Sequence, residues 1–325
     1  MIIIIMVDIK NNLMKITHTT WIVTLLILIL LPQSNVLANE WHTRTTSHFT
    51  LYYHLKDRRL ADYIMESAEE DYMRIVGDIG IDPGITTRVY LAPDSRTYQE
   101  LIPGSRKSHE WSVGIFSPAE NKIVLLSPKA QKVGHPDLQQ IMAHELTHFV
   151  LHTITRKHKV KLPVWLNEGL AMYEARQWDW HYRSIMAQIS LSKSFAPLAS
   201  LKENFPQERR NAERAYAQSI SVIAFILNKH GVNALHGIID KLIHGKTTRG
   251  AFQTVLGISL EEFERQWHAY LRRRYTWVPI ITSSFTIWFL ISILVLGIYF
   301  YKRRQAKQKM ILWELEDQMF DHWGL

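Results

Sequence analysis

Apolar side chains recur at the spacing of a helix or of a strand along much of the chain. Residues 58–79 predict an α-helix through seven apolar positions three and four apart: Leu60, Tyr63, Ile64, Ala68, Tyr72, Ile75 and Val76. Residues 48–54 and 87–92 predict strands, and Pro83-Gly84 breaks the chain between them.

A hairpin is expected over residues 111–126. Its arms are residues 111–116 and 122–126, and residues 117–121 form the turn. We expect the second arm to lie at an edge of the sheet, where an extended peptide can pair with it.

The pattern beyond residue 137 is typical of helices. Residues 138–150 carry an apolar stripe made of Leu138, Met142, Leu146, Phe149 and Val150. Asp137 is the expected N-cap of this helix, with Gln140 as its capping-box partner, and Pro163 starts the next helix.

After about residue 195 the helical pattern continues to Arg274, interrupted by Gly231, Gly245 and Gly257. Ser259 opens a second capping box that ends at Glu262. Strands followed by helices predict an α+β fold.

The first 38 residues resemble a secretory signal peptide. Lys10 and Lys15 precede the apolar run 21–31, and small residues precede a cleavage site after Ala38. Met14 offers an alternative start for this signal. An uncleaved membrane anchor is the other interpretation.

Residues 276–301 predict a transmembrane helix because they contain no charged side chain over 26 positions. At about 1.5 Å per residue, such a helix covers a hydrocarbon core of roughly 30 Å. Five basic residues follow it: Lys302, Arg303, Arg304, Lys307 and Lys309. They favour a cytoplasmic tail over 302–325. Arg272 to Arg274 on the other flank oppose that orientation, and the signal peptide decides for residues 39–275 outside the cytoplasm.

Composition narrows the class of protein further. The chain of 325 residues has no cysteine, which excludes disulfides and thiol chemistry and suits a bacterial envelope protein. The net charge is +8, of which +6 remains after the two ends are removed. This charge suits a position near an anionic membrane, whereas no basic run interleaved with aromatics indicates nucleic acid.

The strongest chemical signal is His144-Glu145-Leu146-Thr147-His148. On a helix, His144 and His148 share one face and can bind one metal ion, and Glu145 beside them can handle a proton. Glu168 follows at the spacing that a second helix supplies. Two histidines, one carboxylate and an open position are what a catalytic zinc ion needs.

Other residues near the motif have plainer interpretations. The metzincin pattern is excluded because positions 151 and 154 hold Leu151 and Ile154 in place of Gly and His. His152 is expected beside the ligands or facing solvent. Glu174 is the alternative to Glu168 as the third ligand, although it points to a different side of the same helix.

The chain resembles the gluzincin metallopeptidases in two segments, residues 144–148 and 165–173. It is most similar to the peptidase MA-like domains of bacterial envelope proteins, over roughly residues 45–273. The resemblance implies a thermolysin-like zincin domain over residues 39–274, with an N-terminal mixed sheet and a helical C-terminal part. The glycine-rich exopeptidase motif of the related aminopeptidases is missing, so endopeptidase activity is expected.

The resemblance also implies roles for individual residues. One zinc ion would be held by His144, His148 and Glu168, with Glu145 as the catalytic base. Tyr216 is the candidate donor to the oxyanion, with Tyr173 as the alternative. Asn167 would orient the neighbouring loop or a ligand.

Three hypotheses follow for the whole chain. The first is a zinc metallopeptidase acting on proteins or peptides and anchored by residues 276–301. The second is a catalytically silent relative that tethers envelope components, which the presence of Glu145 disfavours. An intramembrane protease is disfavoured because polar residues surround the motif helix. The tail 302–325 either forms a helix that contacts a partner or the membrane surface, or has little fixed structure.

Overall fold

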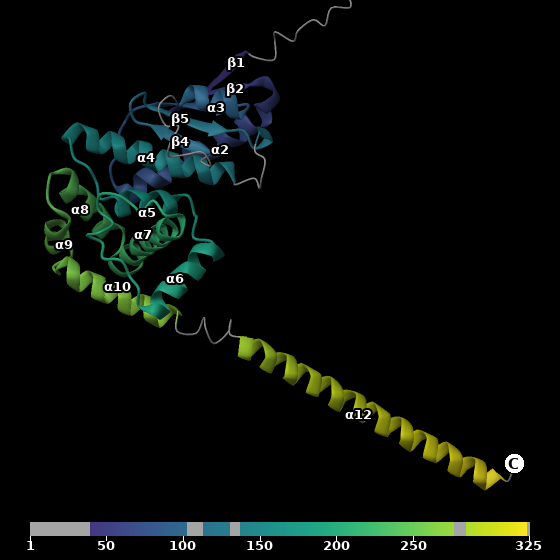
Figure 1. The fold of residues 1–325 in the computed structure, drawn as a ribbon. Helices are drawn as coiled ribbons and strands as arrows, with labels where there is room; N and C mark the ends of the chain where they lie inside the picture. Colours follow the sequence, from purple (N-terminus) through teal and green to yellow (C-terminus); the bar gives the residue numbers. More distant parts are fainter. Residues whose placement is uncertain (1–39, 103–112, 131–136, 276–283, 324–325) are drawn as a thin grey trace, which may run out of the picture. The chain divides into compact units, whose positions relative to one another are not determined.

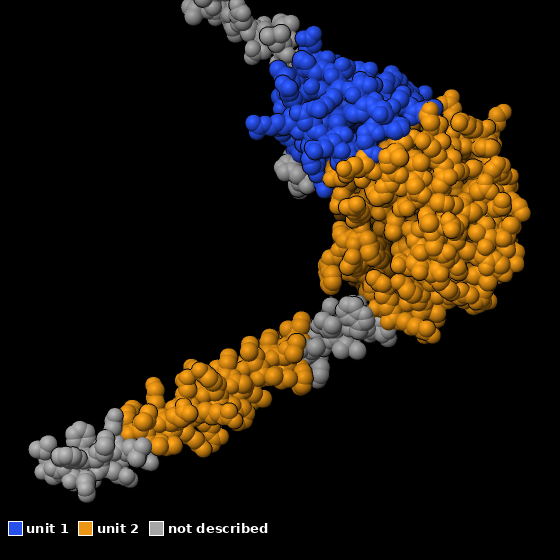
Figure 2. All heavy atoms as spheres, turned by 180° about the vertical axis from the view of Figure 1, so that it is seen from behind, with its two compact units in different colours: residues 1–69, 85–138 blue, residues 70–84, 139–325 orange. Residues whose placement is uncertain are grey.

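A computed structural model describes residues 40–102, 113–130, 137–275 and 284–323 (Figure 1). The described residues within 1–69 and 85–138 make up the first of two compact units, shown blue in Figure 2. Residues 70–84 and 139–325 make up the second, shown orange. The predicted signal peptide, residues 1–38, lies outside the described residues.

The described part of the first unit contains a five-stranded mixed sheet. Its strands are β1 (Trp41–Thr45), β2 (Phe49–His54), β3 (Thr87–Ala92), β4 (Gly114–Ser117) and β5 (Lys122–Leu126). They lie in the order β1-β2-β3-β5-β4, with the two inner pairs parallel and the two outer pairs antiparallel. The predicted strands are therefore confirmed within a mixed sheet, and β1 was not predicted. The hairpin is confirmed over residues 114–126, whereas residues 111 and 112 of its first arm lie outside the described residues.

Alternation of apolar and polar positions sets the faces of this sheet. In β2, Phe49 and Leu51 are fully buried, whereas Thr50 and Tyr52 are partly exposed. Tyr52 lies opposite Tyr90 of β3, and their rings stack with centroids 4.6 Å apart. A slip of one residue would bring the polar face into the core, so the burial pattern specifies this register.

The helix α2 (Arg58–Ile79) confirms the helix predicted over these residues. It follows the short 3-10 turn η2 (Leu55–Asp57) and connects β2 to β3. A parallel strand pair needs such a crossover. Four of the predicted apolar positions are fully buried, namely Ile64, Ala68, Tyr72 and Ile75, whereas Tyr63 is exposed.

The expectation that residues 122–126 form a sheet edge is wrong. β5 pairs with β3 on one side and with β4 on the other, so β1 and β4 are the edges of the described sheet. All five residues of β5 are buried. The continuous apolar run from Ile123 to Leu126 is typical of an interior strand with both faces covered.

Two short elements complete the first unit. In α3 (Ser95–Leu101), the Asp94 carboxylate caps the helix by accepting a hydrogen bond of 2.8 Å from the Thr97 backbone. Tyr98 of α3 packs into a buried cluster with Val124. The 3-10 turn η3 (Pro128–Ala130) follows β5.

The second unit is mainly helical in its described residues. Its helices are α4 (Leu138–His158), α5 (Val164–Glu174), α6 (Trp180–Ser192), α7 (Arg209–His230), α8 (Val232–Ile243), α9 (Thr248–Leu256) and α10 (Leu260–Tyr275). Leu138 itself is grouped with the first unit. The helical pattern predicted for this half of the chain is confirmed, and α6 was not predicted.

The expected helix boundaries agree with the structure. α4 begins directly after Asp137, and α5 begins directly after Pro163. Gly257 follows α9 in the left-handed conformation, with φ of 70°. The Ser259 hydroxyl accepts a hydrogen bond of 3.1 Å from the Glu262 backbone, which confirms Ser259 as the N-cap of α10.

The last helix, α12 (Ser284–Trp323), runs from the apolar segment into the basic tail. The helix expected in the tail is therefore present as far as Trp323, whereas its contact with a partner or the membrane surface stays a prediction. Among the residues that the structure describes, no helix combines the length and the apolar character that a membrane crossing requires. Residues 276–283 of the predicted span lie outside the described part.

Candidate metal centre

The motif helix α4 holds its two histidines side by side. The Nε2 atoms of His144 and His148 are 3.1 Å apart, and their rings meet edge to face with centroids 4.8 Å apart. Between them, Thr147 is fully buried and donates a hydrogen bond of 2.8 Å to the Ala143 carbonyl. The helix thus satisfies its own buried hydroxyl and leaves both imidazoles for the site.

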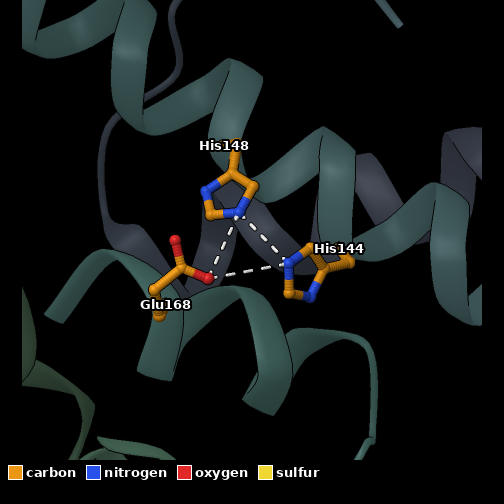
Figure 3. Close-up of side chains that lie close together, drawn as sticks. All are labelled: His144, His148 and Glu168. Carbon is orange, nitrogen blue, oxygen red and sulfur yellow. Dashed lines mark hydrogen bonds and ion pairs between the residues drawn. The ribbon is translucent and has the colours of Figure 1, made fainter. Parts of the chain in front are cut away.

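Glu168 reaches this pair from α5. Its Oε2 lies 3.9 Å from Nε2 of His144 and 3.8 Å from Nε2 of His148 (Figure 3). Figure 3 shows the three side chains converging from two helices on one point. Their ligand atoms all lie within 4.8 Å of one another, and all three residues are partly buried. The structure therefore brings together the three residues predicted from the sequence.

The donor set and its spacing fit a zinc ion. A tetrahedral ion with bonds of about 2.0–2.2 Å separates its ligand atoms by roughly 3.3–3.6 Å. The three observed separations of 3.1, 3.8 and 3.9 Å bracket that range. Two imidazoles and one carboxylate also leave the fourth position open, as in a catalytic zinc site.

The protonation of His144 suits a metal ligand. Burial lowers the pKa of His144 to about 3, and the neighbouring His148 acts in the same direction. The ring is therefore neutral at pH 7, with a lone pair available for a metal ion. Its other nitrogen, Nδ1, lies 3.2 Å from Oε1 of Gln177. Gln177 was not among the residues predicted from the sequence.

Different charged groups act on the pKa values of the two candidate tyrosines. Burial raises the pKa of Tyr216 on α7, and the site carboxylates Glu168 and Glu145 raise it further. Burial also raises the pKa of Tyr173, but the charged neighbours that act on it are Asp78, Glu174 and Arg74. The carboxylates that act on Tyr216 therefore belong to the candidate metal centre. The charges that act on Tyr173 belong to a separate group of side chains.

Neither alternative ligand belongs to the three-residue cluster. Glu174 is buried at the end of α5 and forms an ion pair with Arg74 of α2. Arg74 also donates a hydrogen bond of 2.9 Å to the Glu174 carbonyl and pairs with Asp71 at 2.8 Å. His152 is half-buried one turn beyond His148 and lies outside the cluster.

Close packing of α5 on α7 positions Glu168. A Cβ atom added to Gly169 would lie 2.6 Å from the Ser219 carbonyl oxygen, closer than real Cβ contacts allow. The two helices run side by side in Figure 1. Glycine at the position after Glu168 is therefore explained by the approach of the α7 backbone.

A comparison with protein families gives a direct result. The profile of the Peptidase MA superfamily matches residues 67–273, more than half of the chain. The chain belongs to this superfamily. The match includes α4 and α5, and it confirms the predicted resemblance to peptidase MA-like gluzincins. A comparison with curated proteins gives no match.

Membership of the peptidase MA superfamily establishes a metallopeptidase-like domain. Its mixed sheet and helical remainder also agree with the α+β architecture expected for the superfamily. Peptidases of this superfamily are typically zinc enzymes, and the cluster of His144, His148 and Glu168 supplies a suitable set of ligands here.

The packing at Gly169 leads to a prediction about stability. Gly169→Ala should lower the free energy of unfolding by about 1–3 kcal/mol, because α5 has to move away from α7. Gly77→Ala in α2 is the matched control, since a Cβ atom there meets nothing within 4 Å. The free energy of unfolding of the control should rise by up to about 1 kcal/mol, because alanine has a higher helix propensity than glycine. Urea denaturation measures the free energy of unfolding of both variants. If Gly169→Ala were as stable as Gly77→Ala, the packing account would be contradicted.

Proposed function

We propose that the chain is a zinc-dependent endopeptidase of a bacterial envelope, anchored in the membrane with its catalytic domain outside the cytoplasm. The observation that carries the proposal is the convergence of His144, His148 and Glu168, with Glu145 adjacent to His144 in the motif. An inert module would need the folded helices, but it would have no chemical need for a carboxylate at this position.

Zinc bound at this site would supply a Lewis acid for the scissile carbonyl and lower the pKa of an attacking water towards about 7. Glu145 is half-buried and lies between the two ligand histidines in the sequence. In our proposal its carboxylate takes the proton of the attacking water and passes it to the leaving amine. Glu145 thereby acts as base and then as acid in hydrolysis of one peptide bond.

Tyr216 is the proposed donor to the developing oxyanion. Burial and the two nearby carboxylates raise its pKa, so the phenol keeps its proton across the working pH range. A protonated hydroxyl can donate a hydrogen bond to the negative oxygen of the tetrahedral intermediate. Asn167 is proposed to orient the neighbouring loop or a ligand.

The substrate class follows from the reaction and from the sequence. The proposed substrate is a protein or peptide, because the chain belongs to a peptidase superfamily. Internal cleavage is preferred over removal of terminal residues, since the glycine-rich motif that captures a substrate amino terminus is missing from the sequence.

Membrane anchoring is a separate part of the proposal. It is supported by the uncharged run of 26 residues at 276–301 and by the basic residues that follow it. The signal-like first 38 residues support export, and the lack of cysteine suits a bacterial envelope. The tail 302–325 would then face the cytoplasm, where it could contact a partner or the membrane surface.

Substitution of the proposed base tests catalysis. Glu145→Gln should keep one zinc ion per chain and lower kcat on an unstructured protein substrate about 10²–10⁴-fold, because the amide cannot accept the water proton. Glu66→Gln, at an exposed glutamate, should leave kcat unchanged. Zinc content by atomic emission and cleavage of labelled casein measure the two properties.

The outcomes of this experiment separate the hypotheses. Equal cleavage by wild type and Glu145→Gln would remove Glu145 from the mechanism. Bound zinc without cleavage of any substrate would favour the silent binding module.

Removal of the phenol hydroxyl tests the oxyanion donor. Tyr216→Phe should lower kcat about 10²–10³-fold with little change in KM, because the hydrogen bond forms only as charge develops on the oxygen. Tyr173→Phe should have a small effect. A larger loss in Tyr173→Phe than in Tyr216→Phe would exchange the two roles.

Truncation tests the anchor. A chain that ends at Tyr275 should appear in the soluble fraction after alkaline carbonate extraction, whereas the full chain should stay with the membrane. Retention of the truncated chain would show that an uncleaved N-terminal segment is the anchor. Release of the full chain would contradict membrane insertion altogether.

A further inference from the structure

Gln177 contacts the metal centre from outside the three-residue cluster. Its side-chain Oε1 lies 3.2 Å from Nδ1 of His144. The amide oxygen accepts a hydrogen bond from this ring when the proton of a neutral His144 sits on Nδ1. Nε2, which faces His148 and Glu168, then keeps its lone pair.

Backbone hydrogen bonds hold the chain around Gln177 in place. Arg176 adopts the left-handed conformation with φ of 55°, directly after α5 ends. The Arg176 N–H donates a hydrogen bond of 3.0 Å to the Tyr173 carbonyl, and the Gln177 N–H donates one of 2.9 Å to the Met172 carbonyl. These two bonds form the Schellman turn that commonly closes a helix. The turn directs the chain back so that Gln177 can reach α4.

Hydrogen bonds from Arg74 hold the same end of α5. Arg74 binds both the carboxylate and the carbonyl of Glu174, three residues before Gln177. The segment that starts at Glu168 therefore supplies one ligand directly and the partner of a second ligand through its terminal turn. Both contributions depend on the placement of one helix.

The other histidine has no such partner among the described residues. Nδ1 of His148 is buried and makes no hydrogen bond there. Gln177 therefore gives Nδ1 of His144 a partner that Nδ1 of His148 lacks among the described residues. Loss of the Gln177 contact would leave the Nδ1 atoms of both rings without a hydrogen bond.

We propose that Gln177 is a positioning residue for the metal centre, acting through His144. The inference rests on the proposed zinc function and adds to it the residue that sets the tautomer and orientation of one ligand. Such partners of metal-bound histidines typically contribute about 10–100-fold in metal affinity.

The test is zinc affinity, measured on the full chain in detergent by competition with a chromophoric chelator. Gln177→Ala should bind zinc about 10–100-fold more weakly than wild type. Gln177→Glu should bind at least as tightly as wild type, because a carboxylate accepts the same Nδ1–H. Gln188→Ala, at an exposed glutamine of α6, is the matched control and should not differ from wild type. Thermal unfolding of the zinc-free variants reports whether each one folds.

Three results would overturn the inference. Unchanged affinity in Gln177→Ala would remove the positioning role, while wild-type zinc binding would leave the proposed function standing. Equal weakening in Gln177→Ala and Gln177→Glu would show a role in packing only. A wild-type chain that binds no zinc would overturn both the inference and the proposed function.

Discussion

The close contact between α5 and α7 is the constraint on which the metal centre depends. Gly169 lies against the Ser219 backbone with no room for a side chain, so a larger residue there would force the two helices apart. Glu168 precedes Gly169 in α5, and Tyr216 lies one turn before Ser219 in α7. A single packing contact therefore determines where a ligand and a candidate catalytic phenol can lie. Because this contact is between backbone and glycine, little rearrangement of side chains can relieve a larger residue there.

The opposite end of α5 is held by hydrogen bonds from Arg74. Glu174 is buried, and burial raises its pKa to about 8 although Arg74 acts in the opposite direction. The same guanidinium also donates a hydrogen bond to Asp71. Removal of the guanidinium would leave the buried Glu174 carboxyl without this donor, which is costly for a buried polar group. A site built on helices held in this way is more rigid than one built on loops, as ordered ligands require.

The parts of the site that could be predicted from the sequence are those set by helical spacing. His144 and His148 share a face because they are four residues apart, and the Trp-Leu-Asn-Glu-Gly segment predicted Glu168 as the third member of the cluster. Gln177 could not be found this way because it reaches His144 only through a left-handed turn at Arg176. The strand order could not be predicted from local sequence patterns either. β5 is an interior strand because β4 folds back and pairs with its outer side. β1 has an exposed half and no clear alternation, so only its pairing with β2 makes it a strand.

The central claim is that two imidazoles and one carboxylate bind a single zinc ion with one position left open. X-ray absorption at the zinc edge of the loaded full-length protein tests this most directly. The account predicts one zinc per chain, four nitrogen or oxygen ligands at about 2.0–2.2 Å, and outer-shell scattering from two imidazole rings. Glu168→Gln should bind zinc more weakly than wild type, because a neutral amide replaces a carboxylate ligand. A spectrum from six oxygen ligands without imidazole scattering would contradict the account.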